Sequence, residues 1–156
     1  MGVTVVDAGP NQVSRSIIVD AEASELFEIV ADPRRHSELD GSGTVRDTVN
    51  GPDRLSEGAK FSINMNQRGF GYRITSRVTK FANGRLIEWR HPVGHRWRWE
   101  FAPQADGRTR VTETFDYSRS GGGKAKIVYY NLIRAPKQNA GGIEATLVKL
   151  QERFAS

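Results

Sequence analysis

Seven short β-rich segments, most of them separated by turn signals, constrain the fold of this chain more than any other feature of its sequence. The strongest turn signal is Asn83-Gly84, because both residues tolerate the positive φ angles of a two-residue hairpin turn. Strands joined by an unbroken series of hairpins run antiparallel. The predicted strands cover residues 12–20, 44–49, 59–66, 71–81, 85–91, 95–102 and 108–118.

Two helical segments accompany these strands. A short helix follows the first strand and ends at Asp32-Pro33, because a proline disfavours the helical conformation of the residue before it. A longer helix is predicted to begin near Pro136. Its apolar stripe consists of Ile143, Leu147, Leu150 and Phe154. The order strand, short helix, six strands, long helix predicts an α+β fold, in which a seven-stranded curved antiparallel sheet wraps around the C-terminal helix.

Length and composition narrow the class of protein. The 156 residues predict a single domain over residues 1–156. The absence of cysteine excludes disulfides, thiolate catalysis and cysteine zinc sites, and we expect neither a metal ion nor a cofactor. No apolar stretch approaches the ~20 residues of a membrane span, and the N-terminal segment has no basic start of a signal peptide. These features predict a cytoplasmic protein without stable membrane insertion.

The net charge of +5 raises the question of a nucleic-acid partner. Many arginines have the strand parity opposite to the apolar residues, and Glu88 and Glu100 are interspersed among them. These outward arginines are Arg73, Arg77, Arg90, Arg96, Arg98 and Arg110. We interpret this outer face as solvated, with weak cross-strand ion pairs, and expect no nucleic-acid partner. The alternative is an interaction module that uses the basic outer face.

The segment Trp97-Arg98-Trp99-Glu100-Phe101 alternates aromatic and charged residues, so its rings point to one face of the sheet. Such rings either fill a core or line a cavity for an apolar ligand. A cavity is expected because one helix leaves a gap beneath a strongly bent sheet. The residues predicted to contact a ligand are Phe61, Met65, Tyr72, Trp89, Trp97, Trp99, Phe115 and Tyr130.

Glu113 is the polar residue of greatest interest, because it shares the apolar parity of Val111 and Phe115. A carboxyl group inside the cavity would have a raised pKa and could act as a general acid or base. The alternative is a β-bulge that turns Glu113 outward and Asp116 inward. The other weak catalytic candidates are Tyr72 and His36.

The chain has three histidines, and His36 lies in the connection after the first helix, where the cavity mouth is expected. His36 and Asp40 are one helical turn apart, so they either serve the site or simply hydrogen-bond and cap the turn. His91 and His95 flank a turn and could approach each other across a hairpin. The glycines in the segment 118–124 predict a mobile gate for the cavity.

Several strings together resemble the START-like superfamily, also called Bet v 1-like or SRPBCC, and within it the bacterial polyketide cyclase/dehydrase and lipid-transport group. Among them are Arg15-Ser16-Ile17-Ile18-Val19-Asp20-Ala21, Ile87-Glu88-Trp89, Trp97-Arg98-Trp99, and the segment from Pro136 through Asn139 and Gly142 to Leu150. The resemblance implies a helix-grip fold and a cavity that binds apolar or amphipathic small molecules.

The leading functional hypothesis is therefore the binding of a lipid, polyketide or related hydrophobic molecule between the sheet and the C-terminal helix. The resemblance also implies an alternative, a polyketide cyclase or dehydratase that uses the same cavity. A protein of this type is expected as a monomer or a homodimer.

Overall fold

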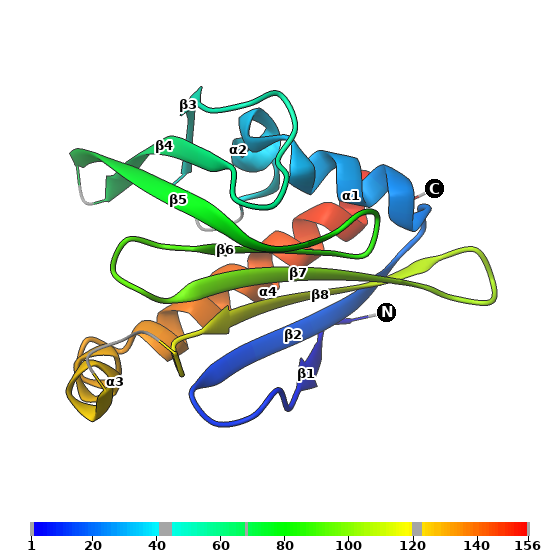
Figure 1. The fold of residues 1–156 in the computed structure, drawn as a ribbon. Helices are drawn as coiled ribbons and strands as arrows, with labels where there is room; N and C mark the ends of the chain where they lie inside the picture. The colour runs from blue at the N-terminus through cyan, green and yellow to red at the C-terminus, as the bar shows by residue number, and fades with distance from the viewer. Residues whose placement is uncertain (1, 41–44, 68, 120–122, 156) are drawn as a thin grey trace.

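The computed structural model describes residues 2–40, 45–67, 69–119 and 123–155, with the backbone alone for residues 45–49 and 65–67. Over these residues, eight antiparallel strands form one sheet in the order β1-β2-β8-β7-β6-β5-β4-β3 (Figure 1). The strands are β1 (Thr4–Val6), β2 (Gln12–Val19), β3 (Val45–Asn50), β4 (Lys60–Gln67), β5 (Phe70–Ala82), β6 (Leu86–Arg90), β7 (Arg96–Pro103) and β8 (Thr109–Asp116).

Strands β2 to β8 are the seven predicted strands, and the α+β helix-grip architecture is confirmed. The short β1 adds an eighth strand at the edge of the sheet, where Thr4 pairs with Ser16 and Val6 with Ser14. A three-residue strand is too short to produce a recognisable alternation, so β1 was not predicted. The turn after β5 has three residues, 83–85, instead of the expected two, because Ala82 pairs with Leu86. Gly84 has φ +78°, as its turn signal predicts, but Asn83 does not have a positive φ.

The helices are α1 (Ala23–Ala31), a 3-10 turn (Pro33–Arg35), α2 (His36–Leu39), α3 (Gly123–Leu132) and α4 (Ala135–Arg153). Three of the four α-helices in the described ranges, α1, α2 and α4, pack against the sheet. Helix α4, which contains Pro136 in its first turn as predicted, runs behind β6, β7 and β8 in Figure 1. Helix α3 stands out beyond one end of the sheet.

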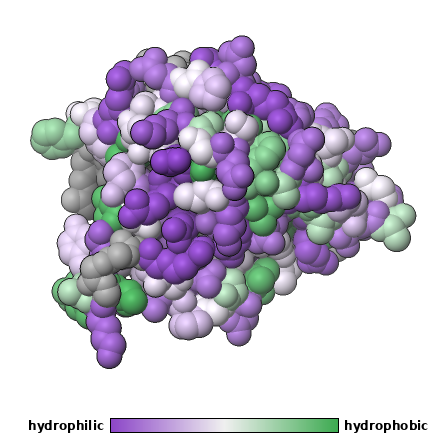
Figure 2. Space-filling view, in the orientation of Figure 1, coloured by the Kyte–Doolittle hydropathy of each residue, from purple (hydrophilic) through white to green (hydrophobic). Residues whose placement is uncertain are grey.

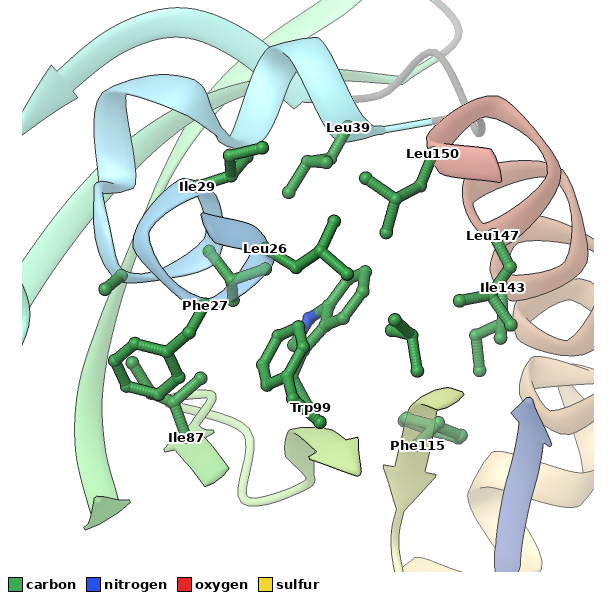
Figure 3. Close-up of a cluster of buried hydrophobic side chains, with 14 of the residues drawn as sticks. Leu26, Phe27, Ile29, Leu39, Ile87, Trp99, Phe115, Ile143, Leu147 and Leu150 are labelled. Atoms are coloured by element: carbon green, nitrogen blue, oxygen red, sulfur yellow. The ribbon is translucent and has the colours of Figure 1, made fainter. Parts of the chain in front are cut away.

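The hydrophobic core fills the space between α1, α2, α4 and the concave face of the sheet, as Figure 3 shows. Phe27 on α1 packs edge-on against Phe81 and Phe101 at centroid distances of 5.5 and 5.8 Å. Leu147 and Leu150 on α4 approach from the opposite side and are also fully buried. The same cluster continues toward α3, where Phe115, Tyr117 and Tyr130 are also buried.

The convex face of the sheet has the expected arginines, but it is less solvated than predicted. The Glu88 side chain is 0 % exposed and lies within 3.5 Å of guanidinium nitrogens of Arg96, Arg98 and Arg119. Thr79 also donates a hydrogen bond to the Glu88 carboxylate. The long arginine side chains cover the glutamate with their own hydrocarbon stems, an effect that residue parity does not report. We call Glu88, Arg96, Arg98 and Arg119 the outer ionic cluster.

Candidate ligand-binding cavity

A cavity of about 530 Å³ lies between the concave face of the sheet, α2 and α4. Five of the residues predicted to contact a ligand lie in its wall: Phe61, Tyr72, Trp89, Trp97 and Trp99. The remaining lining residues are His36, Leu39, Asp40, Ile63, Ile74, Ser76, His91, His95, Glu113, Ile133, Gln138, Asn139, Gly142, Ile143 and Thr146. The wall therefore combines aromatic and aliphatic side chains with nine polar ones, three of which are histidines.

Two predicted ligand contacts lie one layer deeper than expected. Phe115 is fully buried, and its ring packs behind Trp97 at a centroid distance of 5.1 Å. Tyr130 on α3 is 3 % exposed and packs against Phe115 and Tyr117. Neither residue belongs to the cavity wall, because His95 and Trp97 stand in front of them. Met65 lies outside the residues whose side chains are described.

His36 has a structural partner of its own. Its Nε2 atom lies 2.7 Å from the carbonyl oxygen of Val30, and its ring stacks on Trp89 at 5.0 Å. Phe61 packs edge-on against both rings at 5.5 Å. Burial lowers the pKa of His36, although the hydrogen bond to Val30 partly opposes this effect. His36 is thus an uncharged part of the wall near neutral pH.

His91 and His95 approach each other across the turn after β6, as their spacing suggested. Their rings stack at 4.2 Å, and His95 Nδ1 lies 2.8 Å from the hydroxyl oxygen of Tyr130. Burial lowers the pKa of His91 to about 4. Burial, assisted by the charges of His91 and Lys126, lowers the pKa of His95 to about 3. Both rings are therefore neutral at physiological pH.

Glu113 points into the cavity, so the bulge that would turn it outward does not occur. Strand β8 keeps an unbroken register with both neighbours, and Glu113 pairs with Trp99 on β7 and Arg15 on β2. The guanidinium group of Arg15 instead donates to Glu144 on α4 and to the Ser14 carbonyl. Asp116 lies on the convex face, where Ser118 and Arg119 donate to its carboxylate.

The Glu113 carboxyl group lacks the partners that a buried carboxylate needs. Glu113 is only 7 % exposed, and its Oε1 atom has no hydrogen-bond partner in the described part of the chain. Burial raises the pKa of Glu113 well above its ordinary value, and the negative charge of Asp40 raises it further. A protonated Glu113 would offer one O–H donor to the interior of the cavity.

Helix α4 contributes polar groups that sequence reasoning missed as site residues, namely Gln138, Asn139 and Thr146. Asn139 and Thr146 recur at helical spacing with Ile143, so they interrupt the apolar stripe on the face toward the sheet. That interruption was the available signal. Among the residues known to line the cavity, there are acids at Asp40 and Glu113 but no lysine or arginine.

Over the described ranges, no group of three or more metal-ligating side chains comes together. The same ranges contain no helix with the length and apolar character needed to cross a bilayer. The segment 118–124, predicted to be a gate, includes residues 120–122, which lie outside the described residues.

Comparisons with known proteins agree with this geometry. Residues 10–155 match the family described as polyketide cyclase/dehydrase and lipid transport. An uncharacterized protein of Mycobacterium tuberculosis, Rv0088, is 57 % identical over 99 % of this chain and 69 % of its own length. A crystal structure of a Rhodobacter sphaeroides protein superposes with a TM-score of 0.72 at 12 % identity, covering 97 % of this chain and 96 % of that one.

A further solved structure is the di-domain ARO/CYC protein BexL from the BE-7585A biosynthetic pathway. It superposes with a TM-score of 0.67 at 18 % identity, over 90 % of this chain and 45 % of BexL. At such identities the two solved structures support the fold alone.

Proposed function

Because this chain belongs to the polyketide cyclase/dehydrase and lipid-transport family, we propose that its cavity binds one uncharged, largely apolar small molecule with a polar oxygen directed at Glu113. The observation that carries the proposal is the unpartnered, buried Glu113 carboxyl in an aromatic wall. A ligand oxygen would supply the missing hydrogen-bond partner. A volume of about 530 Å³ is within the range of small-molecule sites.

The charges of the wall favour a neutral ligand. A carboxylate in the cavity would face Asp40 and Glu113 without a lysine or arginine among the known lining residues. Burying an unpaired negative charge is costly, and a second negative charge nearby adds to that cost. A ketone, ester, amide or hydroxyl oxygen can accept from a protonated Glu113 at much lower cost. We therefore expect neutral oxygenated molecules rather than free fatty acids.

The binding test uses the neutral dye Nile red, monitored by its own emission and by quenching of tryptophan fluorescence. Ser76 is buried in the cavity wall, so Ser76→Phe should fill the cavity and weaken dye binding at least tenfold. Thr75→Phe is the matched control, because Thr75 is the next residue on β5, is exposed, and points to the other face. Equal binding by both variants would contradict the cavity as the binding site.

Trp99→Ala is a poorer test of the cavity than Ser76→Phe. Trp99 is 3 % exposed and stacks with Phe101, so it belongs to the core as well as to the cavity wall. Its truncation is expected to cost roughly 3–5 kcal/mol of stability. Loss of dye binding in that variant would therefore not separate ligand contact from unfolding.

The second candidate function is a cyclase or dehydratase, and Glu113 is the observation that favours it. In a dehydration, a protonated Glu113 would give its proton to a departing substrate hydroxyl, which leaves as water. The resulting carboxylate would take a proton from the adjacent carbon as the double bond forms. Glu113→Gln should then abolish turnover of a β-hydroxyketone substrate while Nile red still binds. Unchanged turnover would exclude this role for Glu113.

A further inference from the structure

Helix α3 exposes a group of large apolar side chains. Val128, Tyr129, Leu132 and Ile133 are 55, 54, 77 and 45 % exposed. Since successive helical residues are rotated by roughly 100°, these four residues form one continuous stripe along the outward side of α3 and the turn after it. Figure 2 shows hydrophobic atoms gathered over α3 at the lower left of the view.

The opposite side of α3 holds the helix in place. Tyr130 is buried, and its hydroxyl oxygen lies 2.8 Å from His95 Nδ1. The hydroxyl group of Tyr117 donates to Asn131 Oδ1 at 3.2 Å, and Ile127 packs against the core. These inward contacts fix which side of α3 faces outward. Both sides of α3 are apolar, and one of them has no cover among the described residues.

The segment that contains α3 also concentrates the positive charge of the protein. Between Asp116 and Glu144 the sequence has no acidic residue, and it has five basic ones: Arg119, Lys124, Lys126, Arg134 and Lys137. The other basic residues number 18, which equals the number of acidic residues in the whole chain. This one segment thus accounts for the net charge of +5.

These charges flank the exposed stripe. Lys124 and Lys126 precede it on its two sides, at about 100° around the helix from its centre, and Arg134 and Lys137 follow it. Within the described ranges, Lys124, Arg134 and Lys137 form no ion pair with a carboxylate. An apolar stripe bordered by basic side chains is the pattern of helices that lie in the interface of an anionic bilayer.

We propose that α3 docks this protein on an anionic membrane surface, with Val128, Tyr129, Leu132 and Ile133 in the headgroup layer. The lysines and arginines beside them contact the lipid phosphates. Docking by α3 does not require a span, so it agrees with the lack of a long apolar helix over the described residues.

The exposed stripe on α3 lies next to one end of the cavity. Ile133 belongs both to the exposed stripe and to the cavity wall. His95, which contacts Tyr130, and His91 also line the cavity at this end. Docking would therefore place the α3 end of the cavity against the lipid, where an apolar molecule could pass between bilayer and cavity without crossing water.

The test is flotation of the purified protein with phosphatidylcholine vesicles, prepared with and without phosphatidylglycerol and without any added cavity ligand. We expect binding to the anionic vesicles, weakened by salt and reduced with phosphatidylcholine alone. Leu132→Asn should weaken it roughly tenfold, because a leucine side chain leaves the interface. Lys124→Gln and Arg134→Gln should each weaken it about fivefold.

Two matched controls separate docking from general hydrophobicity and charge. Val5→Asn removes an exposed apolar residue from β1, and Lys80→Gln removes an exposed lysine from β5; both should bind vesicles like the unaltered protein. Equal loss in the controls, or no binding to anionic vesicles, would overturn the proposal. So would concentration-dependent self-association in the absence of vesicles that Leu132→Asn abolishes, because a second copy would then cover the stripe.

Discussion

The two faces of the sheet each bury a glutamate, and the two glutamates are treated in opposite ways. Glu88 on the convex face is 0 % exposed and is surrounded by Arg96, Arg98, Arg119 and the Thr79 hydroxyl group. Glu113 on the concave face is 7 % exposed, has an unpartnered oxygen, and has Asp40 as its electrostatic neighbour. Both lie on central strands, so position in the sheet does not explain the difference.

The difference shows how the same side chain serves structure on one face and remains available on the other. A buried carboxyl group with several cationic partners joins neighbouring strands and the segment after β8. A buried carboxyl group without such partners is kept neutral at some expense in stability, and it retains a donor for another molecule. The contrast therefore marks the concave face as the functional one.

The first prediction has the largest expected effect and tests the structural role of Glu88. Glu88→Gln keeps the shape of the side chain but leaves the positive charges of Arg96 and Arg98 without their main buried partner. We expect a loss of about 3 kcal/mol in the free energy of unfolding, measured by urea denaturation. Glu113→Gln, in the same assay at neutral pH, should be neutral or stabilising. The comparison fails if the two variants lose the same stability.

The second prediction concerns the pH dependence of stability. The folded protein holds the Glu113 proton more tightly than the unfolded chain does, because the pKa of Glu113 is raised from its ordinary value of 4.5. Its contribution is fully present below that value and is lost as the pH rises toward the folded-state pKa, by up to about 1.4 kcal/mol per pH unit. The negative charge of Asp40 acts on Glu113, whereas the guanidinium group of Arg15 on the neighbouring strand donates to Glu144.

The measurement is the difference in unfolding free energy between the unaltered protein and Glu113→Gln across this pH range. Subtraction removes the contributions of carboxylates such as Glu28 and Glu38, whose pKa values are lowered by hydrogen bonds from Arg54 and Arg35. A flat difference would mean that Glu113 titrates normally.

Strand parity placed Glu88 on the outer face, because seven of the strands and their alternation are evident in the sequence. For Glu113 it favoured the inner face but left a β-bulge as the alternative, which the unbroken register of β8 rules out. Parity did not predict the surroundings of either glutamate. The burial of Glu88 depends on Arg96, Arg98 and Arg119, which come from β7 and from the segment after β8. The isolation of Glu113 depends on Arg15 turning to Glu144 on α4. These ion pairs join residues that are distant in the sequence, so the pairing depends on the folded structure and leaves no periodic pattern in the sequence.

The same limit applies to the cavity wall. Parity identified Phe61, Trp89, Trp97 and Trp99, but it placed Phe115 in the wall although His95 and Trp97 stand between that ring and the cavity. Parity gives the face of a residue and not its depth. The layer order depends on side-chain size and on the turn that brings His95 forward.

The third prediction tests whether the cavity around Glu113 prefers neutral ligands to anionic ones. An aryl ketone, acetonaphthone, should bind more tightly than the carboxylate naphthoate of the same ring system at neutral pH. Glu113→Gln should weaken ketone binding by about 1 kcal/mol, which is the net value of one hydrogen bond. Isothermal titration calorimetry measures both ligands. Tighter binding of naphthoate would contradict the proposed preference for neutral ligands.

The smallest expected effect lies within the outer face. The Glu100 side chain is 45 % exposed and receives a hydrogen bond of 3.0 Å from Arg98 Nε. Since exposed ion pairs contribute little, Glu100→Gln should cost roughly 0.5 kcal/mol in the urea assay. A cost as large as that of Glu88→Gln would show that burial does not separate the two glutamates.

The pairing of β2 with β8 has a consequence for how the protein forms. Gln12 lies opposite Asp116 in this pairing, so about a hundred residues must be ordered between two neighbouring strands. Closing such a long loop is entropically costly and slow compared with forming the local hairpins. The hairpins from β4 to β8 can therefore form first. Strand β2 is synthesised early, but it can pair only after β8 and α4 have been synthesised. The cavity is then one of the last features to exist, completed only when the α4 segment packs across β2 and β8.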